Sequence, residues 1–146
     1  LTIGTLDGAN VEIRNEVGPE NIFIFGLQAH EVTSLKARGY APETFVASNP
    51  DLARTLDMID SGYFSPANVF DGKPIVGRLL SDGEPFLVLA DFAAYARAQD
   101  AVDALYLQPD EWSRKAVLNA LGMGTFSSDR SIREYAERIW RIKPVL

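Results

Sequence analysis

Three short runs of apolar residues along the chain are typical of buried β-strands. They lie at residues 1–5, 21–25 and 86–90. Residues 22–25 read IFIF, so this run has no polar face that could point to water. Each run is followed by a helical pattern, as in folds where helices connect parallel strands. The pattern therefore predicts a small sheet of buried, parallel strands.

Apolar residues elsewhere recur at the three- and four-residue spacing of amphipathic helices. These segments begin at capping residues or prolines and end at glycines, which are the usual boundary residues of helices. Helices are predicted at residues 7–14, 29–38, 49–61, 73–81, 91–105, 109–121 and 127–140, with a further helix start at Ser65-Pro66. Asp7 and Asp91 are expected to be the N-caps of their helices. The Tyr and Trp residues fall on helical stripes and are expected in the core, with platforms that stack on sugars as the alternative.

No repeat, low-complexity tract or linker interrupts the chain, so residues 1–146 are expected to form one domain without an internal boundary. Three strands are few for an α/β fold, which usually has about five or six. Either the fold is mainly helical, or further strands precede Leu1. The chain opens without methionine and inside a strand pattern, which indicates that it begins within a larger protein. The predicted fold class is α/β and rich in helix.

Composition excludes several classes of function. The chain has 146 residues and is 47% hydrophobic, which is enough for a buried core. A net charge of −6 without a cluster of Lys and Arg argues against nucleic acid or an anionic membrane as a partner. The absence of cysteine and the single histidine exclude disulfides, thiolate nucleophiles and metal clusters of several histidines. With no apolar run long enough to span a bilayer, we expect a soluble protein. The absence of cysteine fits a reducing compartment, and the expected location is cytoplasmic.

The stretch GTLDGANVE, from Gly4 to Glu12, is the most unusual part of the sequence. A strand that runs through a glycine-containing turn into a helix can bind phosphate, because free backbone N–H groups and the positive helix end point outward. The spacing from Gly4 to Gly8 matches neither the dinucleotide fingerprint nor the glycine-rich loop that ends in Lys-Ser/Thr. A plain turn capped by Asp7 is therefore favoured, and a ligand role stays open.

Other candidates for chemistry are weaker. Asp7 and Glu12 lie about 140° apart around a helix, which does not suit an acid/base pair. His30 is expected to face solvent, since no nucleophile motif accompanies it. Residues 126–131 are interpreted as a helix cap with an acidic first turn, with phosphate binding or phosphorylation as the alternative. The pattern alone assigns no catalytic residue and no metal site.

Longer strings of residues carry a resemblance to a known family. LTIGTLDGANVEI, at residues 1–13, closely resembles the α-glucan phosphorylases of glycogen, starch or maltodextrin. Further matches follow in the same order: NIFIFG at 21–26, RGY at 38–40, SGYFSP at 61–66, LADF at 89–92 with Tyr95, Trp112, and FSSDRSI at 126–132 with Tyr135-Ala136 and Ile139-Trp140. The resemblance covers essentially the whole chain and indicates the C-terminal part of a phosphorylase.

This resemblance implies an enzyme that uses pyridoxal phosphate and inorganic phosphate to release glucose 1-phosphate from the terminal α-1,4 glucosyl unit of a glucan. The implied fold is a two-domain GT-B glycosyltransferase, with this chain in its Rossmann-like C-terminal domain, and the implied assembly of the whole protein is a homodimer. The cofactor lysine of the family precedes the equivalent of Leu1. The lysines of this chain, Lys36, Lys73, Lys115 and Lys143, match no such motif. The chain alone is therefore expected to bind no pyridoxal phosphate and to be inactive.

The resemblance places the turn directly after the cofactor segment. Gly4, Thr5, Asp7, Gly8 and Asn10 are expected near the active site without supplying its catalytic groups. Asp7 and Asn10 would satisfy the backbone of the turn and hold the preceding segment in place.

Near the C-terminus, the FSSD block at residues 126–129 is expected to be structural, because in the family it precedes a long helix that packs across the domain junction. Thr125 stands where the family usually has Lys or Arg, so no charged contact is expected from it. The alternative function is a free-standing binding or interaction module that keeps the phosphorylase scaffold. The edge of the strand at residues 1–5 also predicts self-association.

Overall fold

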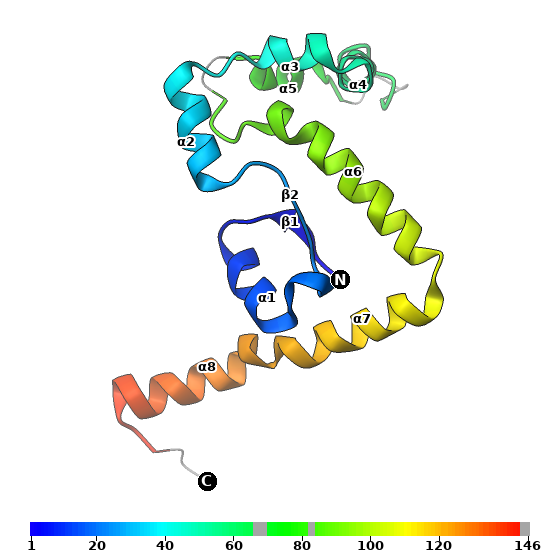
Figure 1. The fold of residues 1–146 in the computed structure, drawn as a ribbon. Coiled ribbons are helices and arrows are strands. Elements are labelled where there is room, and N and C mark those ends of the chain that lie inside the picture. The colour runs from blue at the N-terminus through cyan, green and yellow to red at the C-terminus, as the bar shows by residue number, and fades with distance from the viewer. Residues whose placement is uncertain (66–69, 82–83, 144–146) are drawn as a thin grey trace. The chain divides into compact units, whose positions relative to one another are not determined.

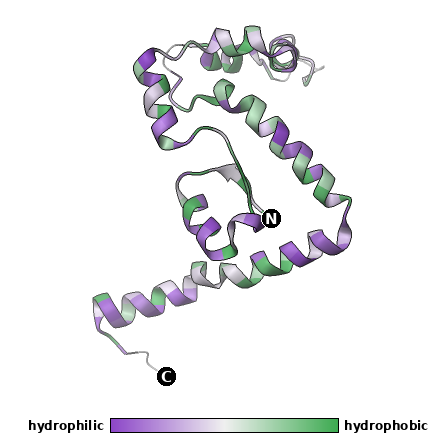
Figure 2. Cartoon of the chain, in the orientation of Figure 1, coloured by the Kyte–Doolittle hydropathy of each residue, from purple (hydrophilic) through white to green (hydrophobic). Residues whose placement is uncertain are grey.

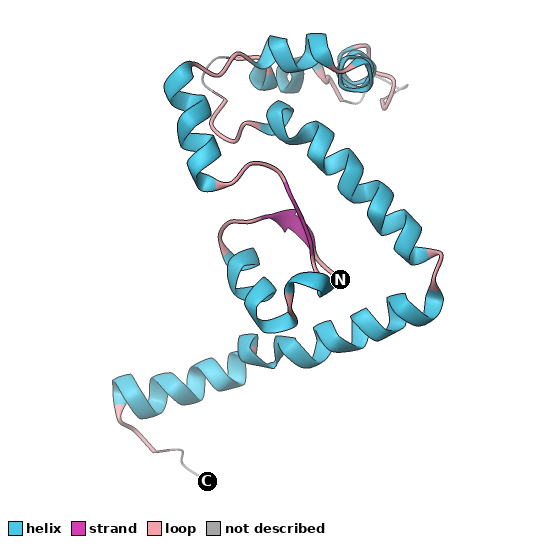
Figure 3. Ribbon diagram, viewed as in Figure 1, coloured by secondary structure: helices cyan, strands magenta, loops and turns pink. Residues whose placement is uncertain are grey.

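The computed structural model describes residues 1–65, 70–81 and 84–143. Helices dominate this part of the chain, and its strands are short (Figures 1 and 3). The elements are β1 (Ile3–Thr5), α1 (Ala9–Val17), the 3₁₀-helix η1 (Pro19–Asn21), β2 (Phe23–Phe25), α2 (Ala29–Arg38), α3 (Pro42–Ser48), α4 (Pro50–Asp60), α5 (Lys73–Leu79), α6 (Val88–Tyr106), α7 (Pro109–Gly122), the 3₁₀-helix η2 (Met123–Phe126), α8 (Ser128–Glu134) and the π-helix η3 (Tyr135–Trp140). β1 and β2 pair in a two-stranded sheet. No helix of the described residues is both long enough and apolar enough to cross a membrane.

The chain divides into two compact units. The first comprises Leu1–Gly4, Gly8–Phe23 and Val102–Leu146, and it holds α1, α7 and the C-terminal helices. The second comprises Thr5–Asp7 and Ile24–Ala101, and it holds α2 to α5 and most of α6.

In the first unit, α7 packs against α1 and η1. The buried Asn119 of α7 donates a hydrogen bond of 2.7 Å from Nδ2 to the backbone carbonyl of Asn21, which is also buried. The contact between the two helices is close at Gly122, where an added Cβ would lie 3.0 Å from the carbonyl oxygen of Glu16. Thr125, whose hydroxyl is neutral, donates a hydrogen bond of 2.9 Å to the carboxylate of the same Glu16.

The core of the second unit lies between α4, α5 and the start of α6. Its buried residues are Leu52, Leu56, Val76 and Leu89. The apolar stripes predicted for residues 49–61 and 73–81 therefore do face a core. α3 was not predicted, yet it contributes Phe45 and Val46 to the same cluster. In Figure 1, α3, α4 and α5 lie close together, in agreement with their contacts.

Helix boundaries that depend on proline and glycine are confirmed. As predicted, α2 ends before Gly39 and α7 begins at Pro109, but α7 includes Gly122 and so ends one residue later than predicted. α4 follows Asn49, whose side chain accepts two backbone N–H groups of the first turn. Two of the predicted strands are found as β1 and β2, although each is shorter than expected and both are half-buried rather than buried. The predicted helix start at Ser65-Pro66 and the predicted stop at residues 82–83 fall, wholly or in part, outside the described residues.

The third predicted strand, at residues 86–90, is wrong. Leu87 has a φ of 55°, a left-handed conformation that ends any extended run, and α6 begins directly after it. The buried carboxylate of Glu84 accepts the backbone N–H groups of Phe86 at 2.7 Å and Val88 at 3.1 Å, and so caps α6. Asp91 is therefore not the N-cap of this helix: it lies in the first turn.

The predicted C-terminal helix, residues 127–140, is found as α8 and η3, but its apolar stripe is not buried. Ile132, Tyr135, Ile139 and Trp140 are exposed, at 55%, 47%, 65% and 53% of their surface. Figure 2 shows apolar residues recurring along this segment. The spacing correctly predicted a helix, but burial also requires a neighbouring element, and none of the described elements covers this face.

Candidate functional site

The turn after β1 is held by Thr5 and Asp7. The Thr5 hydroxyl donates a hydrogen bond of 3.0 Å to the Asp7 carboxylate, and the Asp7 backbone N–H donates one of 2.9 Å to the Thr5 carbonyl. The predicted N-cap role of Asp7 is wrong, because Gly8 occupies the N-cap position of α1 and no side chain caps the helix. Gly8 has φ 46° and ψ −137°, a combination that side-chain-bearing residues rarely adopt. The turn therefore depends on glycine at this position.

Gly4 and Asn10 approach each other closely across the first unit. A Cβ added to Gly4 would lie 3.2 Å from Cγ of Asn10, which is tighter than an ordinary contact. The Asn10 side chain thus folds back on the end of β1, and a larger residue than glycine at position 4 would displace it. Asn10 therefore packs on the strand that leads into the turn.

In the second unit, Thr5 and Asp7 face a cavity of about 510 Å³, which we call the Asp91 cavity. Its remaining walls come from β2, α2 and α6. The lining residues are Thr5, Asp7, Phe25, Leu27, Val32, Phe86, Val88, Asp91, Phe92 and Tyr95. Seven of these ten are apolar or aromatic, and the charged side chains among them are both carboxylates.

Asp91 is fixed in this cavity by the end of β2. Its Oδ1 accepts a hydrogen bond of 2.8 Å from the backbone N–H of Leu27. Gly26 lies against the same carboxylate: an added Cβ would meet its atoms at 2.7 to 2.9 Å. Burial raises the pKa of Asp91, and the negative charges of Asp7 and Glu31 raise it further, while the Leu27 N–H works in the opposite direction. Asp91 is thus a partly buried carboxyl group, and no cation among the described residues is one of the groups that shift its pKa.

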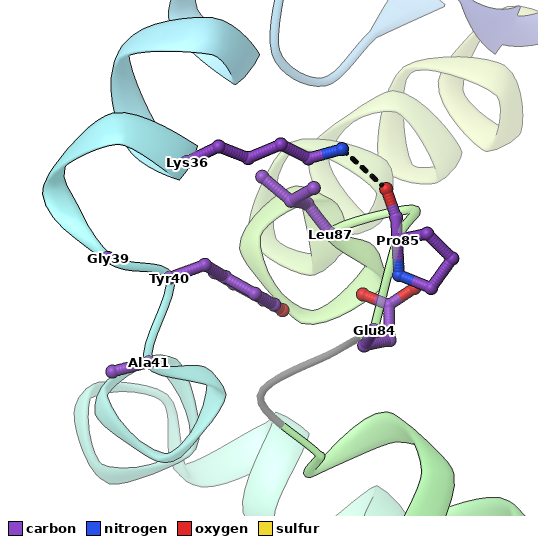
Figure 4. Close-up of a pocket in the computed structure, with 7 residues that line it drawn as sticks. All are labelled: Lys36, Gly39, Tyr40, Ala41, Glu84, Pro85 and Leu87. Atoms are coloured by element: carbon purple, nitrogen blue, oxygen red, sulfur yellow. Dashed lines mark hydrogen bonds between the residues drawn. The ribbon is translucent and has the colours of Figure 1, made fainter.

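A second pocket, of about 640 Å³, lies between the end of α2 and the start of α6 (Figure 4). Lys36 donates a hydrogen bond of 3.0 Å to the carbonyl of Pro85, and Glu84 caps α6. The Tyr40 hydroxyl is buried and has no hydrogen-bond partner of good geometry among the described residues. Burial, followed by the charge of Glu84, raises the pKa of Tyr40. Since both charged groups already bind backbone atoms, this pocket offers little for a ligand.

The remaining candidates from the sequence are not brought into either site. Glu12 is exposed on α1, and His30 is exposed as expected. Ser127 occupies the N-cap position of α8 and Asp129 its first turn, which supports the structural interpretation, although the Ser127 side chain makes no capping hydrogen bond. Among the described residues, no group of three or more His, Cys, Asp or Glu side chains could hold a metal ion.

Comparison with known sequences identifies the family of this chain. The sequence model of the family described as carbohydrate phosphorylase matches residues 1–142. The chain belongs to the carbohydrate phosphorylase family. Glycogen phosphorylase of Synechocystis sp. is 51% identical over 146 residues, and that of Chlamydia pneumoniae is 45% identical over 142 residues. The brain form of human glycogen phosphorylase is 46% identical over 144 residues.

These alignments cover 97% to 100% of this chain but only 17% of each relative. The chain thus corresponds to about one sixth of the length of the carbohydrate phosphorylases that it matches. Most residues of these relatives therefore lie outside the region that this chain matches.

The residues that sequence reasoning missed are those contributed by α6 to the Asp91 cavity. Asp91 and Tyr95 are four positions apart, so they lie on one face of the helix. The Tyr95 ring packs edge-on against Phe25, with centroids 5.3 Å apart. Both α6 residues occur in the LADF and Tyr95 matches to the phosphorylases, and this was the only available signal. The contact with Leu27, which is 64 positions away, could not be read from spacing.

Proposed function

We propose that this chain is the scaffold part of an α-glucan phosphorylase, which in the whole protein releases glucose 1-phosphate from a terminal α-1,4 glucosyl unit with inorganic phosphate. The observation that carries the proposal is the family match over residues 1–142, together with relatives named glycogen phosphorylase at 45% to 51% identity. α-Glucan and phosphate are then the partners of the whole protein, which we place in the cytoplasm as a homodimer.

The chain would form part of one Rossmann-like C-terminal domain of a GT-B enzyme. The order β1–α1–β2 and the pairing of β1 with β2 support this placement, since strand–helix–strand units build such domains. A sheet of two strands is small for that fold, so further strands would come from residues outside this chain. We also propose that residues 1–146 belong to one domain without an internal boundary.

The turn from Gly4 to Asn10 would hold the segment that precedes it. The close packing of Asn10 on Gly4 and the hydrogen bonds between Thr5 and Asp7 support a positioning role for these residues. Gly8 would set the direction in which α1 leaves the turn. In this proposal none of these five residues touches the substrate.

The residues of this chain do not fit a pyridoxal phosphate site. A Schiff base needs a lysine beside the cofactor, and its phosphate needs donors or cations. Lys36 and Lys115 donate to the backbone carbonyls of Pro85 and Glu20, and neither lines the Asp91 cavity. The charged residues among those that line the cavity, Asp7 and Asp91, are carboxylates, which repel a phosphate dianion. The cofactor lysine and the phosphate cradle would therefore lie in other parts of the whole enzyme.

An experiment on the isolated chain tests whether the cofactor site lies in other parts of the whole enzyme. Incubated with pyridoxal phosphate, maltodextrin and inorganic phosphate, it is expected to form no glucose 1-phosphate. Reduction with borohydride is expected to leave no pyridoxyl group on Lys36, Lys73, Lys115 or Lys143 above the level of the chain unfolded in urea. Phosphate-dependent turnover by the pure chain, or one lysine labelled selectively in the folded state, would overturn the proposal.

A further inference from the structure

The Asp91 cavity has the size and lining of a small-molecule site. Its volume of about 510 Å³ falls within the range of roughly 300 to 1,000 Å³ that is usual for ligand pockets. Apolar walls with a few converging polar groups, one of them with a shifted pKa, are the common features of such sites. The cavity lies entirely within the second unit.

The negative charge of the cavity favours a positively charged ligand. Asp7 and Asp91 are the carboxylates in its wall, and no Lys, Arg or His of the described chain lines it. Glu31 adds a third negative charge near Asp91. None of the described cations contributes to the charge felt by Asp91, so the ionised carboxyl group is left without compensation. A cation that enters the cavity would compensate the negative charge of Asp91.

The position of this charge is rigid. The Leu27 N–H holds Oδ1 of Asp91 at 2.8 Å. Gly26 has a φ of 81°, and this conformation brings the backbone against the carboxylate without a side chain in between. A ligand would therefore meet a carboxylate that is already oriented, and little side-chain freedom would be lost on binding.

The aromatic rings that line the cavity indicate that most of the ligand is apolar. Phe25, Phe86, Phe92 and Tyr95 line the cavity. Phe25 and Tyr95 form an edge-on pair, and Phe86 is 79% exposed although it lies on the cavity wall. Aromatic faces attract cations and also pack against flat or cyclic apolar groups. The lining thus favours an apolar body that carries one positive charge.

We propose that the Asp91 cavity binds a small organic ammonium ion carried on an aromatic or alicyclic body, with Asp91 and Asp7 as its counter-charges. The proposal concerns a binding site that is separate from the phosphorylase function proposed above and does not rest on it.

Titration of the whole 146-residue chain with three matched probes tests the proposal. The probes are 2-phenylethylammonium, the neutral 2-phenylethanol and the anionic 3-phenylpropionate, followed by calorimetry and by backbone amide chemical shifts. The ammonium ion is expected to bind at least about tenfold more tightly than the alcohol, with shifts centred on Leu27, Asp91 and Tyr95, and the carboxylate is expected not to bind. Equal affinity for the alcohol, or no binding of the ammonium ion, would overturn the proposal.

Variants distinguish binding through the Asp91 carboxylate from nonspecific binding. Asp91→Asn keeps the shape and the acceptor for Leu27 N–H, and is expected to weaken binding of the ammonium ion at least about tenfold. Asp100→Asn removes an exposed charge from the same helix, outside the cavity, and is expected to leave the affinity within about twofold. Should Asp91→Asn not fold, Asp7→Asn in the exposed turn is expected to weaken binding in the same direction. Unchanged affinity in the folded Asp91 or Asp7 variant would contradict the assignment and would leave the phosphorylase proposal untouched.

Discussion

The side-chain amide of Asn119 donates a hydrogen bond of 2.7 Å to the backbone carbonyl of Asn21, 98 positions earlier in the chain. Both residues are buried, at 6% and 2% of their surface. The same amide also donates to the carbonyl of Lys115, so its orientation is fixed. This pair links α7 to the segment that leads into β2, within the first unit.

Removal of this amide is expected to destabilise the first unit. Asn119→Ala leaves the buried Asn21 carbonyl without a donor, which costs about 1–3 kcal/mol. Asn15→Ala, at an exposed position of α1, is the control and is expected to change stability by no more than about 0.5 kcal/mol. Urea unfolding followed by the fluorescence of Trp112 and Trp140 measures both variants. Equal midpoints for Asn119→Ala and the wild type would show that the bond contributes nothing.

Two glycines are expected to respond in opposite directions to the same substitution. Gly26→Ala forces a side chain into a φ of 81° and places Cβ 2.7–2.9 Å from the Asp91 carboxylate, so it should destabilise the protein by about 1–3 kcal/mol. Gly77 lies within α5 with nothing within 4 Å of an added Cβ. Gly77→Ala should therefore stabilise it by about 0.4–1 kcal/mol. Thermal unfolding by circular dichroism gives the sign of each change, and the same sign for both would contradict the geometry.

The ionisation of Asp91 gives a pH dependence with a definite sign. Burial and the charges of Asp7 and Glu31 raise its pKa in the folded state, so the folded protein holds this proton more tightly than the unfolded chain does. The contribution of Asp91 to stability is therefore complete below its unfolded pKa and is lost as the pH rises through its folded pKa. Asp91→Asn removes this dependence.

Carbon-detected NMR titration of the Asp91 carboxyl group measures the effect directly. Asp7→Asn is expected to lower the pKa of Asp91 towards its usual value, since one repelling charge is gone. Asp100→Asn serves as the control and is expected to leave it unchanged. A pKa of Asp91 at or below the usual aspartate value in the wild type would contradict the burial described for the cavity.

Local signals in the sequence were sufficient for much of the fold. Pro109 begins α7, and Gly39 ends α2, because proline and glycine act on the backbone where they stand. The apolar run at residues 86–90 was misread as a strand because its conformation depends on the Glu84 side chain, which caps the helix that follows. α3 has only seven residues, too few for a clear stripe.

The candidate site was less predictable than the fold. Thr5 and Asp7 were singled out from the turn, and both line the Asp91 cavity. Asp91 was read as a helix cap, because its partner, Leu27, lies 64 positions away and spacing carries no information about such contacts. The exposed stripe of α8 and η3 shows the same limit, since a periodic pattern predicts a helix but not the neighbour that covers it.

The most direct test of the account is an exchange of segments. In the Synechocystis glycogen phosphorylase, the 17% of the chain that matches residues 1–146 is replaced by this sequence, and phosphate-dependent formation of glucose 1-phosphate from maltodextrin is measured. We predict a kcat within about tenfold of the unmodified enzyme, equivalent to no more than about 1.4 kcal/mol of transition-state stabilisation lost. A version with the segment deleted is the negative control. A chimera that folds and binds pyridoxal phosphate but forms no glucose 1-phosphate would contradict the assignment of this chain as a phosphorylase scaffold.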